Sequence, residues 1–163
     1  MAHKNASSDS NVEALISDNT RRQAWMATLA RADISVLEGA WADFTDKPEY
    51  SVIRAPETGM VMVRARAGGE GQRFNLGEMS VTRCVVHTAA GVQGHAYIAG
   101  RDKRHAILAA TFDALLQDPA HHELIEAAVL KPTRTRLAEK RAETTRKVAD
   151  TRVDFFTMVR GDD

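Results

Sequence analysis

Arginine side chains carry the clearest chemical signal in this sequence. Residues 60–67 alternate in a way that is typical of a β-strand, and the even positions of that strand share one face: Met60, Met62, Arg64 and Arg66. Guanidinium groups gathered on one face can hold phosphate through paired hydrogen bonds or dock on an acidic protein surface. A solvated face is the third interpretation. If the strand register allows, arginines of neighbouring strands join this set, which makes four candidates for anion binding or docking: Arg54, Arg64, Arg66 and Arg73.

The odd positions of the same strand are small and apolar, and we expect them to face the core: Val61, Val63, Ala65 and Ala67. On this interpretation Arg64 and Arg66 point outward, away from the core.

Other chemistry-bearing residues form no recognisable motif. The six histidines fit no zinc-binding motif, and the adjacent His121 and His122 would point about 100° apart on a helix. The glycine-rich segment 68–71 lacks the lysine and serine of a phosphate-binding loop, so it is predicted to be a hairpin turn. We therefore predict no metal site and assign no catalytic residue.

Cys84 is the single cysteine of the chain. Because one cysteine is too few for them, the sequence excludes an internal disulfide, a zinc site built on thiolates and an iron–sulfur cluster held by this chain alone. No neighbouring histidine or helix start would lower its pKa, so a packed, inert thiol is predicted.

Composition limits the function classes further. The chain has 163 residues, which suits one domain, and 44% are apolar. Lys+Arg and Asp+Glu both number 22, so the chain lacks the basic excess of a nucleic-acid binder. No apolar run is long enough to span a membrane.

Helical and strand-like segments alternate in a simple order. Capping boxes at Thr20 and Ser35 predict a helical pair, with two tryptophans, Trp25 and Trp41, as core anchors. Short strands with glycine-containing turns follow over residues 50–99, with one turn at 56–59, and predict an antiparallel meander. Helical spacing returns after residue 100, with an apolar stripe of Leu108, Phe112, Leu115 and Leu116. Asp118 as N-cap with Pro119 at the first helical position predicts the start of the next helix. Lys131-Pro132 is expected to break that helix before a last helix over about 134–152, with Thr133 as its cap. The predicted fold class is α+β: an antiparallel meander flanked by an N-terminal helical pair and C-terminal helices.

The chain end combines a basic helix with an apolar tail. Residues 131–152 hold eight basic and three acidic residues, and their large apolar residues are only Leu137 and Val148. A helix this polar buries little surface, so it would carry the tail away from the core. We predict that the tail docks on a partner subunit through five apolar residues: Val153, Phe155, Phe156, Met158 and Val159.

The domain organisation that follows is a disordered leader over 1–18, a single α+β domain over 19–152 and a partner-docking tail over 153–163. The leader is polar and has no secretory signal, so we expect a cytoplasmic protein.

Five segments of the sequence resemble the PhnG family of the bacterial carbon–phosphorus lyase system. They are RQAWM (22–26), IRAPETG (53–59), RFNLGE (73–78), GRDKRH (100–105) and RVDFFTMVRGD (152–162). The resemblance runs from about residue 20 to residue 162 and is weakest over 120–150.

This resemblance implies a pathway and partners. PhnG-like proteins assemble with PhnH, PhnI and PhnJ in a core complex, in which we expect two copies of this chain. With PhnH, PhnI and PhnL they support attack of a phosphonate on ATP at the ribose C1′, which releases adenine and gives α-D-ribose 1-methylphosphonate 5-triphosphate. The iron–sulfur cluster and S-adenosylmethionine belong to PhnJ, and no cofactor is expected on this chain. The resemblance supplies no catalytic residue, so we expect a structural or substrate-shaping subunit, with the displacement chemistry mainly on PhnI.

Two alternatives from other classes stay open on the sequence alone. The first is a stand-alone anion or nucleotide binder that uses Arg54, Arg64 and Arg66. The second is a small histidine-dependent hydrolase. ATP binding by a monodisperse monomer would favour the binder, whereas oligomers or insolubility of the isolated chain would favour the subunit.

Overall fold

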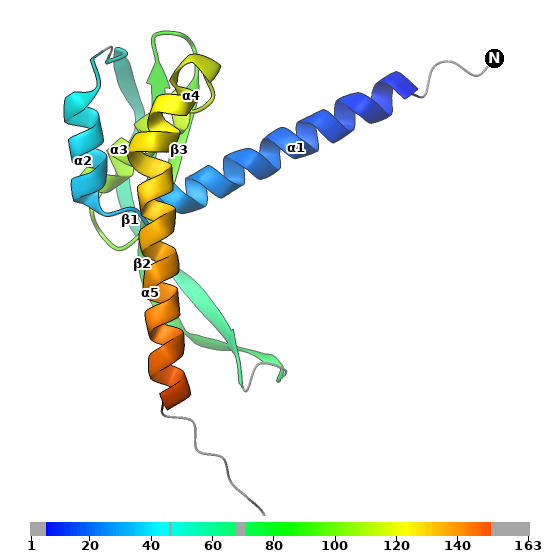
Figure 1. Ribbon diagram of the computed structural model, residues 1–163, viewed down its shortest axis with the longest axis vertical. Helices are drawn as coiled ribbons and strands as arrows, with labels where there is room; N and C mark the ends of the chain where they lie inside the picture. Colours follow the sequence, from blue (N-terminus) through cyan, green and yellow to red (C-terminus); the bar gives the residue numbers. More distant parts are fainter. Residues whose placement is uncertain (1–5, 46, 68–70, 151–163) are drawn as a thin grey trace, which may run out of the picture.

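A computed structural model describes residues 6–45, 47–67 and 71–150 of the chain (Figure 1). The predicted docking tail, 153–163, lies outside these residues. The elements follow one another in this order: α1 (Ala6–Leu29), α2 (Ile34–Asp43), β1 (Tyr50–Arg66), β2 (Arg73–Thr88), β3 (Gln93–Ala99), α3 (Lys103–Leu115), α4 (Pro119–Ile125), the π-helical turn η1 (Glu126–Leu130) and α5 (Lys131–Asp150).

The sheet is an antiparallel meander with the order β1-β2-β3, as the short turns predicted. The β2–β3 turn ends at Gly91, whose φ of +85° is a conformation that favours glycine. Together with the helices on either side in sequence, the meander confirms the α+β fold class.

The turn predicted at residues 56–59 does not exist, because β1 runs through this segment. The Cα pairing passes from Arg54, opposite Val85, to Glu57, opposite Arg83, so Ala55 and Pro56 are bulged out of the register. A bulge on an edge strand absorbs a proline, since the missing N–H leaves no ladder hydrogen bond unmade.

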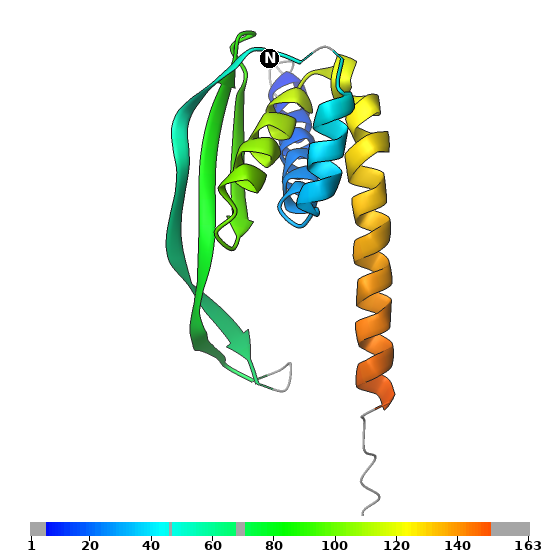
Figure 2. The same ribbon diagram turned by 90° about the vertical axis from the view of Figure 1, so that its left-hand side faces the viewer.

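Helices α1, α2 and α3 pack together on one side of the sheet (Figure 2). Helix α3 lies closest to the sheet. Its backbone is so near β3 at Gly94 that a Cβ atom at this position would come within 1.9 Å of the Ala110 carbonyl oxygen. The predicted stripe of α3 is confirmed, because all four of its members are buried: Leu108, Phe112, Leu115 and Leu116. Trp25 is buried as well, and Trp41 packs against the same core.

Both N-terminal helices begin earlier than the capping boxes predicted. Helix α1 starts at Ala6, so Thr20 lies inside it and residues 6–18 of the predicted leader are helical. No proline or glycine interrupts residues 6–29, and nothing in the local sequence stops the helix. Helix α2 takes Asp33 rather than Ser35 as its N-cap residue.

The predicted break at Lys131-Pro132 is also wrong. Helices α4 and α5 are continuous through the π-turn η1, in which the Lys131 N–H donates to the Glu126 carbonyl. The wider π-turn accommodates the ring of Pro132 and its missing N–H. Thr133, predicted as a cap, is instead buried inside the continuous helix.

Helix α5 buries little surface, as its composition predicted. Leu137 is half-buried and Val148 is 63% exposed. Figure 2 shows α5 extending well past the layer of helices, in the same direction as the end of the β1–β2 hairpin.

Candidate functional site

A buried carboxylate, Asp113 of α3, links three elements of the fold. Its Oδ2 accepts hydrogen bonds from Arg22 Nη2 at 2.7 Å and from the His95 backbone N–H at 2.9 Å. Its Oδ1 accepts from Trp25 Nε1 at 2.8 Å and Arg22 Nε at 3.2 Å. Asp113 is fully buried, and four donors from α1 and β3 satisfy it.

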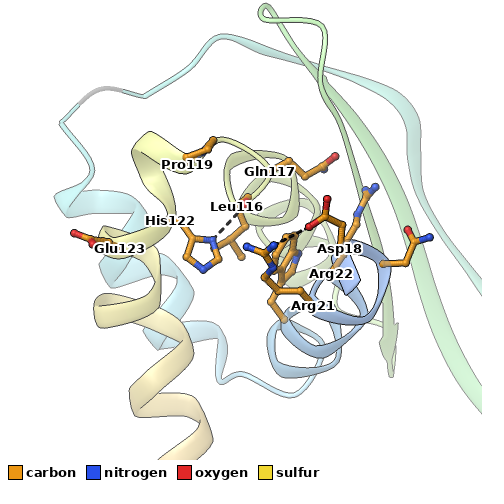
Figure 3. Close-up of a pocket in the computed structure, with 10 residues that line it drawn as sticks. Asp18, Arg21, Arg22, Leu116, Gln117, Pro119, His122 and Glu123 are labelled. Carbon is orange, nitrogen blue, oxygen red and sulfur yellow. Dashed lines mark hydrogen bonds and ion pairs between the residues drawn. The ribbon is translucent and has the colours of Figure 1, made fainter. Parts of the chain in front are cut away.

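A pocket of about 620 Å³ (Figure 3) is lined by Arg22 and Trp25, two of the side chains that bind this carboxylate. It lies where α1 meets the end of α3 and the start of α4. Ten residues line it: Asp18, Asn19, Arg21, Arg22, Trp25, Leu116, Gln117, Pro119, His122 and Glu123.

The charges of this pocket are balanced. Arg21 pairs with Asp18 at 2.7 Å, and Arg22 is bound by Asp113. His122 packs edge-on against Trp25, with ring centroids 5.7 Å apart, and its Nδ1 lies 3.4 Å from the Leu116 carbonyl oxygen. The lining contains no serine, threonine or cysteine, and its contacts between Arg22 and Asp113 and between Trp25 and His122 join α1 to α3 and α4.

The four candidate arginines divide into two groups on opposite faces of the sheet. Arg66 lies directly opposite Arg73, and Arg64 is two residues along the same strand, so these three share one face near the end of the hairpin. Arg54 lies on the other face and contributes to an ion-pair group, in which Glu57 is 3.8 Å from Arg54 and 3.1 Å from Arg83.

Exposure along residues 60–66 follows the predicted alternation, because the even positions are exposed and residues 61, 63 and 65 are half-buried, but the strand pairing places the even positions on the helix-covered side. Thr58 is opposite the buried Thr82, their hydroxyl oxygens are 3.1 Å apart, and Thr82 lies on the helix-covered face. The even positions therefore continue the helix-covered face, and the odd positions face away from the helices. The alternation was read correctly, but neither face has a core here, because the hairpin runs past the helices (Figure 2). Arg64 and Arg66 are exposed, and Val61 and Val63 are only half-buried.

The histidines with described contacts bind backbone or carboxylate groups. The buried His105 places Nε2 2.8 Å from the Leu29 carbonyl oxygen, and His121 Nδ1 is 3.2 Å from Asp118. Within the ranges that the structure describes, no group of three or more His, Cys, Asp or Glu residues could hold a metal ion.

Cys84 is a packed thiol, as predicted. It is 1% exposed, and its Sγ donates to the Arg54 carbonyl oxygen at 3.4 Å. Burial raises the pKa of the thiol, and a hydrogen bond from the Val85 backbone offsets this only in part.

The sequence reasoning missed Asp113. Its signal was a single charged residue within the run 106–116, which is otherwise apolar except for Thr111. A charge in such a run needs a buried partner, and nothing local identifies Arg22 or Trp25, which lie about 90 positions earlier.

These features define a class of protein. It is a small α+β domain with a polar network in its core and a hairpin that carries uncovered apolar side chains, and such surfaces mark sites of protein contact. No helix in the described part of the chain is both long and apolar enough to cross a bilayer.

The chain belongs to the PhnG family, whose model, described as "Phosphonate metabolism protein PhnG", matches residues 20–161. It is 47% identical over 143 residues to the "Alpha-D-ribose 1-methylphosphonate 5-triphosphate synthase subunit PhnG" of Rhizobium meliloti (strain 1021). That alignment covers 88% of this chain and 91% of the relative. The resemblance inferred from the five sequence segments is confirmed.

Proposed function

We propose that this chain is a subunit of an α-D-ribose 1-methylphosphonate 5-triphosphate synthase. The observation that carries the proposal is the 47% identity to a relative of that name over nearly the whole of both chains. In the reaction, a phosphonate oxygen forms a bond to C1′ of the ribose of ATP. The bond between C1′ and adenine breaks, and adenine leaves.

We further propose that the chain does not catalyse this displacement by itself. The two arginines of the pocket between α1, α3 and α4 are each paired with a carboxylate, so neither is free to hold the triphosphate of ATP. The protein then acts as a structural or substrate-shaping subunit together with PhnI, PhnH and PhnL, with the chemistry mainly on PhnI. PhnJ joins the core complex and holds the iron–sulfur cluster with S-adenosylmethionine, so this chain carries no cofactor.

The apolar tail is part of the same proposal. Helix α5 leads away from the helical layer, and the sequence that follows it includes Val153, Phe155, Phe156, Met158 and Val159. We propose that these side chains contact a partner subunit in a cytoplasmic complex that contains two copies of this chain.

Adenine release from ATP and methylphosphonate tests the proposal. We expect no release by the purified chain, none by PhnI, PhnH and PhnL without it, and release by the four together. Appreciable turnover by this chain alone would contradict a non-autonomous role. Full activity of the partners without this chain would contradict the proposal that the chain is a subunit of the synthase.

A second candidate function rests on one observation. Arg64, Arg66 and Arg73 share one face, which suits a polyphosphate as well as an acidic protein surface. Calorimetric titration of the isolated chain with ATP separates the two functions. We expect no binding by a subunit that acts only in the complex, whereas binding that is lost in the Arg64→Ala/Arg66→Ala variant supports a nucleotide binder.

A further inference from the structure

The end of the β1–β2 hairpin forms an arm outside the body of the domain. We define the arm as residues 60–66 of β1 and 73–80 of β2. The third strand pairs with β2 only from Val81 onward, so the arm is two-stranded. At 3.3 Å per residue it is about 25 Å long, and Figure 2 shows it curving beyond the layer of helices.

The arm carries large apolar side chains that nothing in the described chain covers. Met60 is 68% exposed and Leu76 is 63% exposed, and three further members are exposed by 38–50%: Met62, Phe74 and Met79. Isolated two-stranded hairpins are marginally stable in water, and grouped exposed apolar side chains mark a contact surface.

The face of the arm that continues the helix-covered side of the sheet is divided into two parts. Nearest the domain it presents Met60 and Met62, and towards the tip it presents Arg64 and Arg66, with Arg73 opposite Arg66. We call these five residues the Met/Arg face. Glu78 lies opposite Met62 on the same side of the arm. Among the described residues, however, no carboxylate lies within ion-pair distance of the three arginines.

Arg66 and Arg73 are like charges directly opposite each other on neighbouring strands, an arrangement that costs stability unless an anion lies near both. Helix α5 extends in the same direction as the arm, and it is also basic. Charge complementarity therefore specifies an acidic occupant, and the neighbouring methionines specify that it also carries apolar side chains.

We infer that the Met/Arg face binds a segment of a different subunit of the synthase. That segment places carboxylates against Arg64, Arg66 and Arg73 and apolar side chains against Met60 and Met62. This inference rests on the proposed function and adds to it the surface of this chain that makes the contact, separately from the tail.

Two other occupants fit the face less well. A symmetric contact between the arms of two copies would place the arginines of one arm against the same arginines of the other. Repulsion between these like charges disfavours such a contact. A polyphosphate would neutralise the arginines, but it would leave Met60 and Met62 in water.

Co-purification of tagged variants with PhnI, PhnH and PhnJ tests the inference. One variant is Met60→Ser/Met62→Ser and the other is Arg64→Glu/Arg66→Glu. Matched controls outside the arm are Leu124→Ser, at a side chain that is 54% exposed, and Arg31→Glu, at an exposed arginine. We expect each arm variant to lower the recovered partner at least tenfold, both controls to recover it as the wild type does, and all isolated chains to keep the wild-type circular dichroism spectrum.

Four results would overturn the inference. The first is wild-type recovery of partners by both arm variants. The second concerns the isolated Met60→Cys chain: if a thiol reagent labels Cys at this position faster after the tail, residues 153–163, is removed, the tail is the occupant. The third is that isolated wild-type chains form a dimer and that the Arg64→Glu/Arg66→Glu variant does not, which would make a second copy the occupant. The fourth is that this variant loses tripolyphosphate binding but still assembles normally with its partners, which would make a polyphosphate the occupant. Failure of the proposed function looks different, because the wild-type chain would then neither recover partners nor support adenine release.

Discussion

Arg22 of α1 holds the carboxylate of Asp113 at two points, although the two residues are 91 positions apart in the sequence. The Nη2–Oδ2 distance is 2.7 Å and the Nε–Oδ1 distance is 3.2 Å, which is the paired geometry that makes arginine–carboxylate contacts strong. A third Arg22 hydrogen bond, from Nη2 to the Gln93 carbonyl oxygen at 3.2 Å, extends the link to β3. Arg22 thereby connects the N-terminal helix to both layers of the fold.

Replacement of Asp113 by alanine should destabilise the fold strongly. The change leaves Trp25 Nε1 and the His95 N–H without their acceptor and the Arg22 guanidinium without its anion. We expect the free energy of unfolding to fall by about 2–4 kcal/mol, measured by urea denaturation. Glu123→Gln, on the exposed rim of the same pocket, is the control and should change stability by less than about 0.5 kcal/mol. Equal stability of the two variants would contradict a structural role for the buried carboxylate.

Two glycine-to-alanine substitutions in the sheet should differ in effect. At Gly94 a new Cβ would come within 1.9 Å of the Ala110 carbonyl oxygen, so α3 must shift away from β3. We expect a loss of about 1–3 kcal/mol in urea denaturation, as overpacking usually gives. Gly59→Ala is the matched control, because nothing lies within 4 Å of its Cβ position, and it should leave stability close to that of the wild type.

The thiol of Cys84 should react slowly at alkaline pH. Burial raises its pKa, so at pH 8 it holds less thiolate than an exposed cysteine does, and its Sγ is inaccessible as well. We expect Ellman's reagent to label the native chain far more slowly than the same chain in guanidinium chloride. Rapid stoichiometric labelling at pH 8 without denaturant would show that β1 and β2 open around this residue.

The double variant Arg64→Ala/Arg66→Ala should keep the stability of the wild type. Both side chains are exposed on the arm, and the core lies elsewhere in the fold. Surface changes are usually within about 0.5 kcal/mol each, so the melting temperature should fall by no more than a few degrees in a calorimetric scan. Loss of the folded state would mean that the arm is part of the stabilising core.

Deletion of residues 153–163 should leave a folded domain that no longer recovers its partners. The buried cluster of the described chain is built from residues 25–130, so the shortened chain keeps its core. Circular dichroism and thermal melting measure the fold, and co-purification with PhnI or PhnJ measures assembly. If the shortened chain unfolds, the tail is part of the chain's own core. If the shortened chain recovers its partners as well as the wild type does, the partner contact lies elsewhere, and the arm is then the first surface to test.

Local patterns in the sequence were sufficient for the fold class. The apolar spacing of Leu108, Phe112, Leu115 and Leu116 predicted the buried face of α3, and Asp118 with Pro119 predicted the start of α4. Both signals arise within one or two turns of backbone, where side-chain spacing and capping bonds decide the conformation. The family resemblance was also local, because it depended on short segments of fixed sequence.

Pairing across long separations decided the rest. Whether Pro56 ends a strand depends on the edge position and register of β1, and whether Pro132 ends a helix depends on the π-turn that precedes it. The faces of residues 60–66 depend on the pairing of Thr58 with Thr82, which alternation alone cannot orient. Asp113 finds Arg22 and Trp25 only when α1 packs on α3, and the arm is exposed only because β3 stops short of it. Alternation and spacing thus determine which residues share a face, whereas tertiary contacts determine what that face meets.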